Sequence, residues 1–180
     1  MRKNRVVILF LVRFFAVYFA LTVLYSFYLH KTQISSNIFS CAPITKVITQ
    51  HAKNMVELLG YDVFTQQNKD ELSMMFQVNQ KYVVKIVEGC SSIGVVILFL
   101  AFIIAFAGKL KATLLFGVFG IIMIYIVNIF RIVFLVLVIY HFPQFQEVLH
   151  DLVFPAIIYG MVLILWFFWI RYYAIRNKRN

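Results

Sequence analysis

The longest apolar stretch of the chain reads ATLLFGVFGIIMIYIVNIFRIVFLVLVIY, at residues 112–140. A helix needs roughly 20 consecutive apolar residues to cross the hydrocarbon core of a bilayer. This stretch therefore predicts a transmembrane helix, and one long enough to tilt or to protrude from the membrane. Two strongly polar side chains, Asn128 and Arg131, interrupt it.

The composition of the whole chain agrees with a membrane protein. Hydrophobic residues make up 63% of the 180 residues, charged residues only 13%, and the mean hydropathy is +0.88. Soluble domains are roughly 45–50% apolar and about 25% charged. Intrinsic disorder is excluded because apolar surface is abundant. A water-soluble globule is excluded because 20 Phe and 10 Tyr side chains cannot all be hidden in one small core.

Three further apolar runs lie outside the central stretch, at residues 6–29, 91–108 and 152–170. The run at 91–108 is at the short limit for a span. We predict an all-α multipass membrane protein in which four transmembrane helices form a single membrane domain over residues 1–180.

The basic residues predict the orientation. Nine basic residues flank the predicted spans on one side of the membrane, and all seven acidic residues fall on the other side. Because basic residues accumulate in the cytoplasm, both termini and the 109–111 turn are expected there, in the cytoplasmic (inner) membrane. Segments 30–90 and 141–151 are then outside. The net charge of +10 is attributed to this orientation and to anionic membrane lipids, not to nucleic acid. The nine basic residues are Arg2, Lys3, Arg5, Lys109, Lys111, Arg171, Arg176, Lys178 and Arg179.

The outer segment 30–90 has patterns of its own. Pro43 suits the first turn of a helix, and Gly60 suits its end. Apolar residues and His51 recur at helical spacing between them, which predicts an amphipathic helix over 43–59 lying on the membrane or on the spans. Residues 74–78 and 82–87 flank Asn79-Gln80 and predict a small β-hairpin. The helical positions are Ile44, Val47, Ile48, His51, Met55, Leu58 and Leu59.

Three side chains are candidates for chemistry at the outer face. Cys90 begins the second span, where the helix N-terminus stabilises a thiolate. Arg131 lies in the outer half of the third span, and His150 immediately precedes the fourth. Taken singly, each has an ordinary explanation: a small buried thiol, a snorkelling anchor or an interfacial histidine. Together, a thiol, a fixed cation and a base supply the groups that thiolate acyl transfer requires.

The sequence resembles the exosortase/archaeosortase family of multipass membrane cysteine peptidases. The resemblance rests on Glu88-Gly89-Cys90-Ser91-Ser92 opening a span, Asn128-Ile129-Phe130-Arg131 late in the next span, and His150-Asp151 before the last. It covers roughly residues 80–160, and the small size resembles the exosortase F type. Ser92 stands where many members have Gly, and the chain lacks the additional spans of longer members.

The resemblance implies a cysteine protease/transpeptidase that cleaves C-terminal sorting signals of secreted proteins at the outer face of the membrane. Such a signal has a short motif, a membrane helix and a basic cluster. The resemblance carries the catalytic roles over to Cys90, Arg131 and His150. We expect Asn128, Glu88 and Ser91 to bind or orient the substrate.

Three other functions remain open from the sequence. One is a noncatalytic membrane assembly or export factor, and another is a membrane thiol oxidoreductase that uses Cys41 and Cys90. The third is an acyltransferase centred on His150-Asp151. The chain has no CxxC pair and no Cys/His cluster with metal spacing, so neither a metal nor another cofactor is expected.

Overall fold

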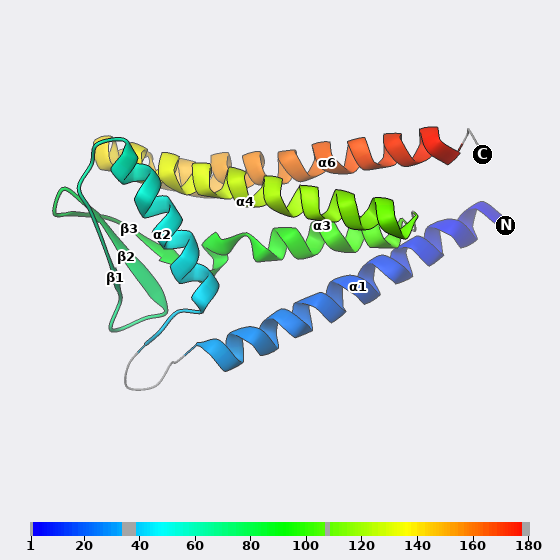
Figure 1. Cartoon of the computed structure of the whole chain (residues 1–180), viewed down its shortest axis with the longest axis horizontal. Coiled ribbons are helices and arrows are strands. Elements are labelled where there is room, and N and C mark those ends of the chain that lie inside the picture. The colour runs from blue at the N-terminus through cyan, green and yellow to red at the C-terminus, as the bar shows by residue number, and fades with distance from the viewer. Residues whose placement is uncertain (1, 34–38, 107–108, 178–180) are drawn as a thin grey trace.

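A computed structural model describes residues 2–33, 39–106 and 109–177. Of the side chains in these ranges, those of residues 2–4, 150, 151 and 173–177 are not described. The chain is mostly helical, with a small sheet at one end of a helical bundle (Figure 1).

Three helices are long and apolar enough to cross a membrane. They are α1 (Arg2–Thr32), α4 (Leu110–His141) and α6 (Phe154–Asn177). Four helices nevertheless run along the bundle, because α3 (Ile93–Ala105) returns beside α1 and α4 (Figure 1). The two termini lie at one end of this bundle and the sheet lies at the other (Figure 1).

The helix α3 is shorter than the predicted span at 91–108. Its 13 residues extend about 20 Å at 1.5 Å per residue, against a hydrocarbon core of about 30 Å. The 3₁₀ turn η1 (Glu88–Ser91) takes up the residues at its start. Three candidate spans are therefore established, and α3 is an apolar helix too short to count as a fourth by length.

The outer segment folds as predicted in its helix but differs in its sheet. Helix α2 (Pro43–Leu58) has Pro43 in its first turn, and Gly60 follows it with a φ of 90°. Strands β2 (Ser73–Val78) and β3 (Lys81–Val87) form the predicted hairpin, with Asn79 and Gln80 both at positive φ. The hairpin prediction was incomplete, because β1 (Val63–Gln67) adds a third antiparallel strand beside β2.

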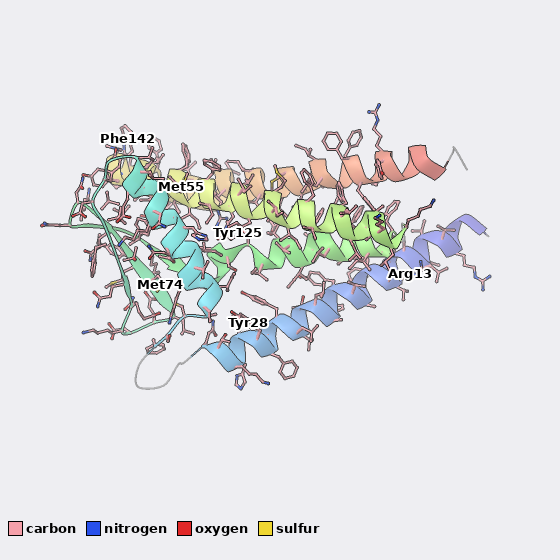
Figure 2. The ribbon with its side chains drawn as sticks, in the orientation of Figure 1. Arg13, Tyr28, Met55, Met74, Tyr125 and Phe142 are labelled. Carbon is pink, nitrogen blue, oxygen red and sulfur yellow. The ribbon has the colours of Figure 1, made fainter. Side chains whose placement is uncertain are left out.

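Helix α2 packs on the spans by a face rotated from the predicted one. Its buried residues include Ile48, Ala52 and Val56, whereas the predicted Leu58 and Leu59 are exposed. The buried face meets the sheet and the C-terminal part of α4, from Ile129 to Ile139, in one apolar core. The ring of His51 is hydrogen-bonded to the hydroxyl of Tyr125, which joins α2 to α4. Figure 2 labels Tyr125 beside α2.

A second core lies nearer the termini, between α3, α4 and α6. Phe99 and Ile103 pack there against Ile124, Val162 and Trp169. Gly117 and Gly120 permit the close approach of α3 and α4. A Cβ on Gly120 would meet the Phe99 ring at 2.2 Å.

The chain between α4 and α6 turns through three short elements at the end of the bundle that carries the sheet. They are η2 (Pro143–Phe145), α5 (Gln146–Val148) and the π-helical turn η3 (Leu149–Val153). The backbone N–H of Phe154 donates to the carbonyl oxygen of Leu149, which closes the wide turn. This turn carries the backbone of His150 directly into α6.

Candidate functional site

Cys90 lies in a sharp junction between the sheet and the bundle. Strand β3 ends at Val87, η1 follows, and Ser92 then adopts a left-handed conformation with a φ of 56° before α3 begins. A side chain at positive φ is strained, and glycine occupies such positions most readily. Ser92 therefore needs compensating contacts to hold the junction in this form.

Asn128 supplies these contacts from α4. Its side chain is completely buried. The Ser92 hydroxyl donates to Asn128 Oδ1 at 2.6 Å, and Asn128 Nδ2 donates to the Cys90 carbonyl oxygen at 2.8 Å. Both bonds end on the junction, so Asn128 fixes the backbone that presents the thiol. Whether it also contacts a substrate stays a prediction.

Cys90 and Arg131 line one cavity of about 300 Å³ at the end of the bundle that carries the sheet. Both side chains are half-buried. Residues of β3, η1, α4 and α6 enclose the cavity, so three distant regions of sequence contribute to it. Cys90 and Arg131, expected at one depth in the spans, thus border the same cavity, and their catalytic pairing stays a prediction. The cavity is lined by Val84, Lys85, Ile86, Val87, Gly89, Cys90, Arg131, Ile132, Leu135, Phe154 and Pro155.

The start of α6 provides the aromatic wall of this cavity. The Cζ atom of Arg131 lies 5.9 Å from the centre of the Phe154 ring, which is a cation–π distance. Nothing in the sequence pattern singles out Phe154, because one more Phe in an apolar run carries no signal. The backbone of His150 lies four residues earlier, in η3. The imidazole lies outside the described side chains, so its meeting with Cys90 stays a prediction.

Glu88 joins the junction to the first turn of α2. One carboxylate oxygen accepts a 2.7 Å hydrogen bond from the Ala42 N–H, and the other accepts a bond from the Thr45 hydroxyl. The N-terminus of α2 has no side-chain cap of its own. Glu88 therefore acts as a cap from a distant part of the sequence, and its negative charge suits the helix dipole. A contact between Glu88 and substrate stays a prediction.

Ser91 faces a second cavity, on the other side of η1. This cavity is about 460 Å³ and lies between the outer part of α1, the start of α3 and α6. Tyr25 and Tyr159 line it with Ser91, and Gly89 borders both cavities. The turn that carries Cys90 is thus open on two sides. Ser91 is expected to act from the side opposite to Arg131.

The second cysteine, Cys41, has a different environment. It is 1% exposed, and both cysteines are free. Burial raises the pKa of the Cys41 thiol. The hydrogen bond with Gln67 lowers this pKa in part, and the negative charge of Glu88 raises it. A buried thiol with a raised pKa is a poor nucleophile and a poor partner for disulfide exchange.

A metal centre finds no support in the described part of the chain. Nowhere among those residues do three or more His, Cys, Asp or Glu side chains gather into a group that could hold an ion. The chemistry available at the described cavity is that of a thiol beside a guanidinium.

One comparison with known proteins identifies a family. The family model described as transmembrane exosortase (Exosortase_EpsH) matches residues 6–173. This match covers all three candidate spans nearly completely, together with the junction and the outer segment. No curated protein and no solved structure matches the chain.

Proposed function

Because the chain belongs to the transmembrane exosortase family, we propose that it is a membrane cysteine transpeptidase acting on C-terminal sorting signals of secreted proteins. The observation that carries the proposal is the cavity shared by Cys90 and Arg131. A half-buried thiol facing a fixed cation is the arrangement that thiolate catalysis requires. The family supports a sorting role, and the cavity supplies residues that can perform it.

The proposed orientation puts both termini in the cytoplasm and the cavity at the outer face of the cytoplasmic membrane. It is supported by the basic residues, which gather near the termini and the 109–111 turn. In this arrangement α3 completes a fourth crossing. Local thinning of the bilayer would accommodate its short length. Substrate arriving on the secreted side would then meet Cys90 directly.

Acyl transfer would proceed in two steps. The Cys90 thiolate attacks the scissile carbonyl carbon, and Arg131 stabilises first the thiolate and then the oxyanion of the tetrahedral intermediate. The C–N bond breaks as His150 donates a proton to the leaving amine, which leaves a thioester on Cys90. His150 then removes a proton from an incoming amine or water, whose attack releases the enzyme.

The substrate would be held largely by groups remote from the reacting carbonyl. Its apolar helix lies beside the spans, with its basic cluster in the cytoplasm, and this binding energy positions the motif at the cavity. Asn128, Glu88 and Ser91 orient the junction and the motif. Membrane lipids surround the remaining apolar surface.

The experiment follows a tagged secreted protein with such a signal in cells that make each variant. The unprocessed precursor should accumulate with each of three variants. Cys90→Ala removes the nucleophile, Arg131→Ala removes the contact with the oxyanion, and His150→Ala removes the proton donor. Cys41→Ala is the matched control and should process normally. Normal processing by Cys90→Ala, at unchanged protein level, would remove the proposal.

A further inference from the structure

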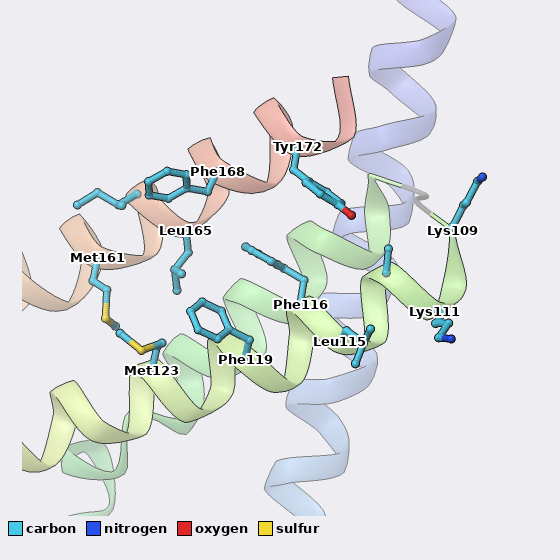
Figure 3. A pocket seen from close by; sticks show the side chains of 12 residues that line it. Lys109, Lys111, Leu115, Phe116, Phe119, Met123, Met161, Leu165, Phe168 and Tyr172 are labelled. Carbon is cyan, nitrogen blue, oxygen red and sulfur yellow. The ribbon is translucent and has the colours of Figure 1, made fainter. Parts of the chain in front are cut away.

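A long groove between α4 and α6 lies at the end of the bundle that carries the termini (Figure 3). Its volume is about 950 Å³, at the upper end of the roughly 300–1,000 Å³ typical of ligand pockets. It shares no lining residue with the cavity of Cys90, which lies toward the other end of α4 and α6. The lining residues are Lys109, Lys111, Ala112, Leu115, Phe116, Phe119, Met123, Met161, Ile164, Leu165, Phe168 and Tyr172.

The groove is apolar along most of its length and positively charged at one end. Its floor and walls are apolar, and Figure 3 shows Phe116, Phe119 and Phe168 between the two helices. Lys109 and Lys111 are both at one end, beside the start of α4, with side chains that point in different directions (Figure 3). Both lysines are exposed. A hydrocarbon slot that ends in two cations matches an amphiphile with an apolar chain and a negative headgroup.

The outer rim of the groove is open to the surrounding medium. Leu115 is 65% exposed, Ile164 57% and Phe168 56%, although all three are apolar. In a membrane these side chains face lipid and not water. The occupant is therefore expected to come from the bilayer itself.

We propose that this groove binds one acyl chain of an anionic phospholipid, whose phosphate lies at the end of the groove that carries Lys109 and Lys111. The charge of the groove argues against a substrate helix as its occupant. A sorting signal ends in a basic cluster, and that cluster would be repelled by two lysines at the same end. The groove is separate from the proposed catalytic cavity, and only the exclusion of a signal helix rests on the proposed function.

Tryptophan fluorescence can report binding, because the chain has only two Trp residues, Trp166 and Trp169. The Trp169 ring packs on Phe116 of the groove at 5.0 Å between centroids, whereas Trp166 stacks on Phe102 of α3. A Trp166→Phe background leaves Trp169 as the single reporter. The protein is reconstituted in phosphatidylcholine vesicles that contain a small fraction of brominated lipid. Bromine quenches indole fluorescence at short range, so a chain that lies against Phe116 is close enough to quench the buried Trp169 without touching it.

Brominated phosphatidylglycerol is expected to quench Trp169 more than brominated phosphatidylcholine at equal mole fraction. Lys109→Gln/Lys111→Gln should weaken this preference about tenfold, because each basic group near a surface contributes to anionic binding. Lys109→Glu/Lys111→Glu should abolish it. Arg2→Gln/Arg5→Gln, which removes equal charge from the start of α1, should keep it.

Equal quenching by the two lipids in the parent protein would overturn the proposal. So would a preference that survives Lys109→Glu/Lys111→Glu. In a competition experiment, a synthetic apolar helix with a basic tail is added to the same vesicles. If it displaces the brominated phosphatidylglycerol and restores fluorescence, the groove binds a signal helix and the lipid assignment is wrong.

Discussion

The side-chain amide of Asn128 donates a 2.8 Å hydrogen bond to the backbone carbonyl oxygen of Cys90. Asn128 precedes Arg131 by three residues, so both project from one face of α4. The helix that carries the guanidinium thus also holds the junction that carries the thiol. Helix α4 therefore sets the position of Arg131 relative to Cys90.

Asn128→Ala should slow processing by roughly tenfold or more, because the Cys90 carbonyl and the Ser92 hydroxyl both lose a buried partner. Such losses cost about 1–3 kcal/mol. The measurement is the rate of precursor cleavage at matched protein level, with substrate retention assayed separately by cross-linking. A positioning role lowers the rate while retention stays unchanged. Asn54→Ala is the control, since Asn54 is exposed on α2 and bonds only with Gln50 among described side chains. An unaltered cleavage rate in Asn128→Ala would contradict this role.

Ser92 offers a test of the junction itself. Ser92→Gly removes the hydroxyl bond to Asn128 but relieves the left-handed strain, which costs about 1–2 kcal/mol for a residue with a Cβ. Ser92→Ala removes the bond and keeps the strain. We expect Ser92→Gly to be more stable than Ser92→Ala by about 1 kcal/mol, measured by thermal unfolding in detergent. Equal stability of the two variants would show that the backbone here is not strained.

Much of the architecture could be predicted because it depends on local patterns. The length of the apolar runs predicts the three long spans. Pro43 and Gly60 predict the ends of α2, and Asn79-Gln80 predicts the hairpin turn. Each of these signals acts within a few residues along the chain.

The differences arise where distant segments decide the outcome. Strand β1 reads VFTQQ and gains its order from pairing with β2, which no local pattern encodes. The face of α2 is selected by the sheet and α4, so Leu58 stays exposed despite its spacing. The carboxylate of Glu88 and the ring of Phe154 acquire their partners only when helices and sheet meet.

Three glycines of the bundle should differ in how much their replacement by Ala destabilises the helix packing. Gly120→Ala should destabilise the protein by about 1–3 kcal/mol, because its Cβ would overlap the Phe99 ring on α3. Gly117→Ala should cost less, since its Cβ meets the end of the Ile103 side chain at 3.3 Å. Gly160→Ala is the control, with nothing within 4 Å, and should be neutral or slightly stabilising. Thermal unfolding in detergent checks the order, and a Gly120→Ala protein as stable as Gly160→Ala would refute the close approach.

Glu88→Gln tests the cap on α2. The neutral amide loses the charge that suits the helix dipole, and one end of it cannot accept a hydrogen bond. We expect a loss of about 1 kcal/mol in stability, with hydrogen exchange accelerated in the first turn of α2. Glu57→Gln, near the exposed end of the same helix, is the matched control. Unchanged exchange at Thr45 and Lys46 in Glu88→Gln would contradict the capping role.

The two thiols should differ in reactivity and in their effect on stability at alkaline pH. Near neutral pH, a small maleimide should label Cys90, which lines an open cavity, while Cys41 stays protected in the folded protein. Because burial raises the pKa of Cys41, the folded state favours its neutral form. Its contribution to stability is therefore complete below the ordinary thiol pKa and is lost as the pH rises through the raised value.

The melting temperature of the parent protein should accordingly fall more steeply above about pH 9 than that of Cys41→Ala. Mass spectrometry of labelled peptides distinguishes the two cysteines, with Cys90→Ala and Cys41→Ala as mutual controls. Faster labelling of Cys41 than of Cys90 would place the reactive thiol in the outer segment. It would also remove the reason for assigning the nucleophile to the junction, since Cys41 has Gln67 and not Arg131 as its polar neighbour.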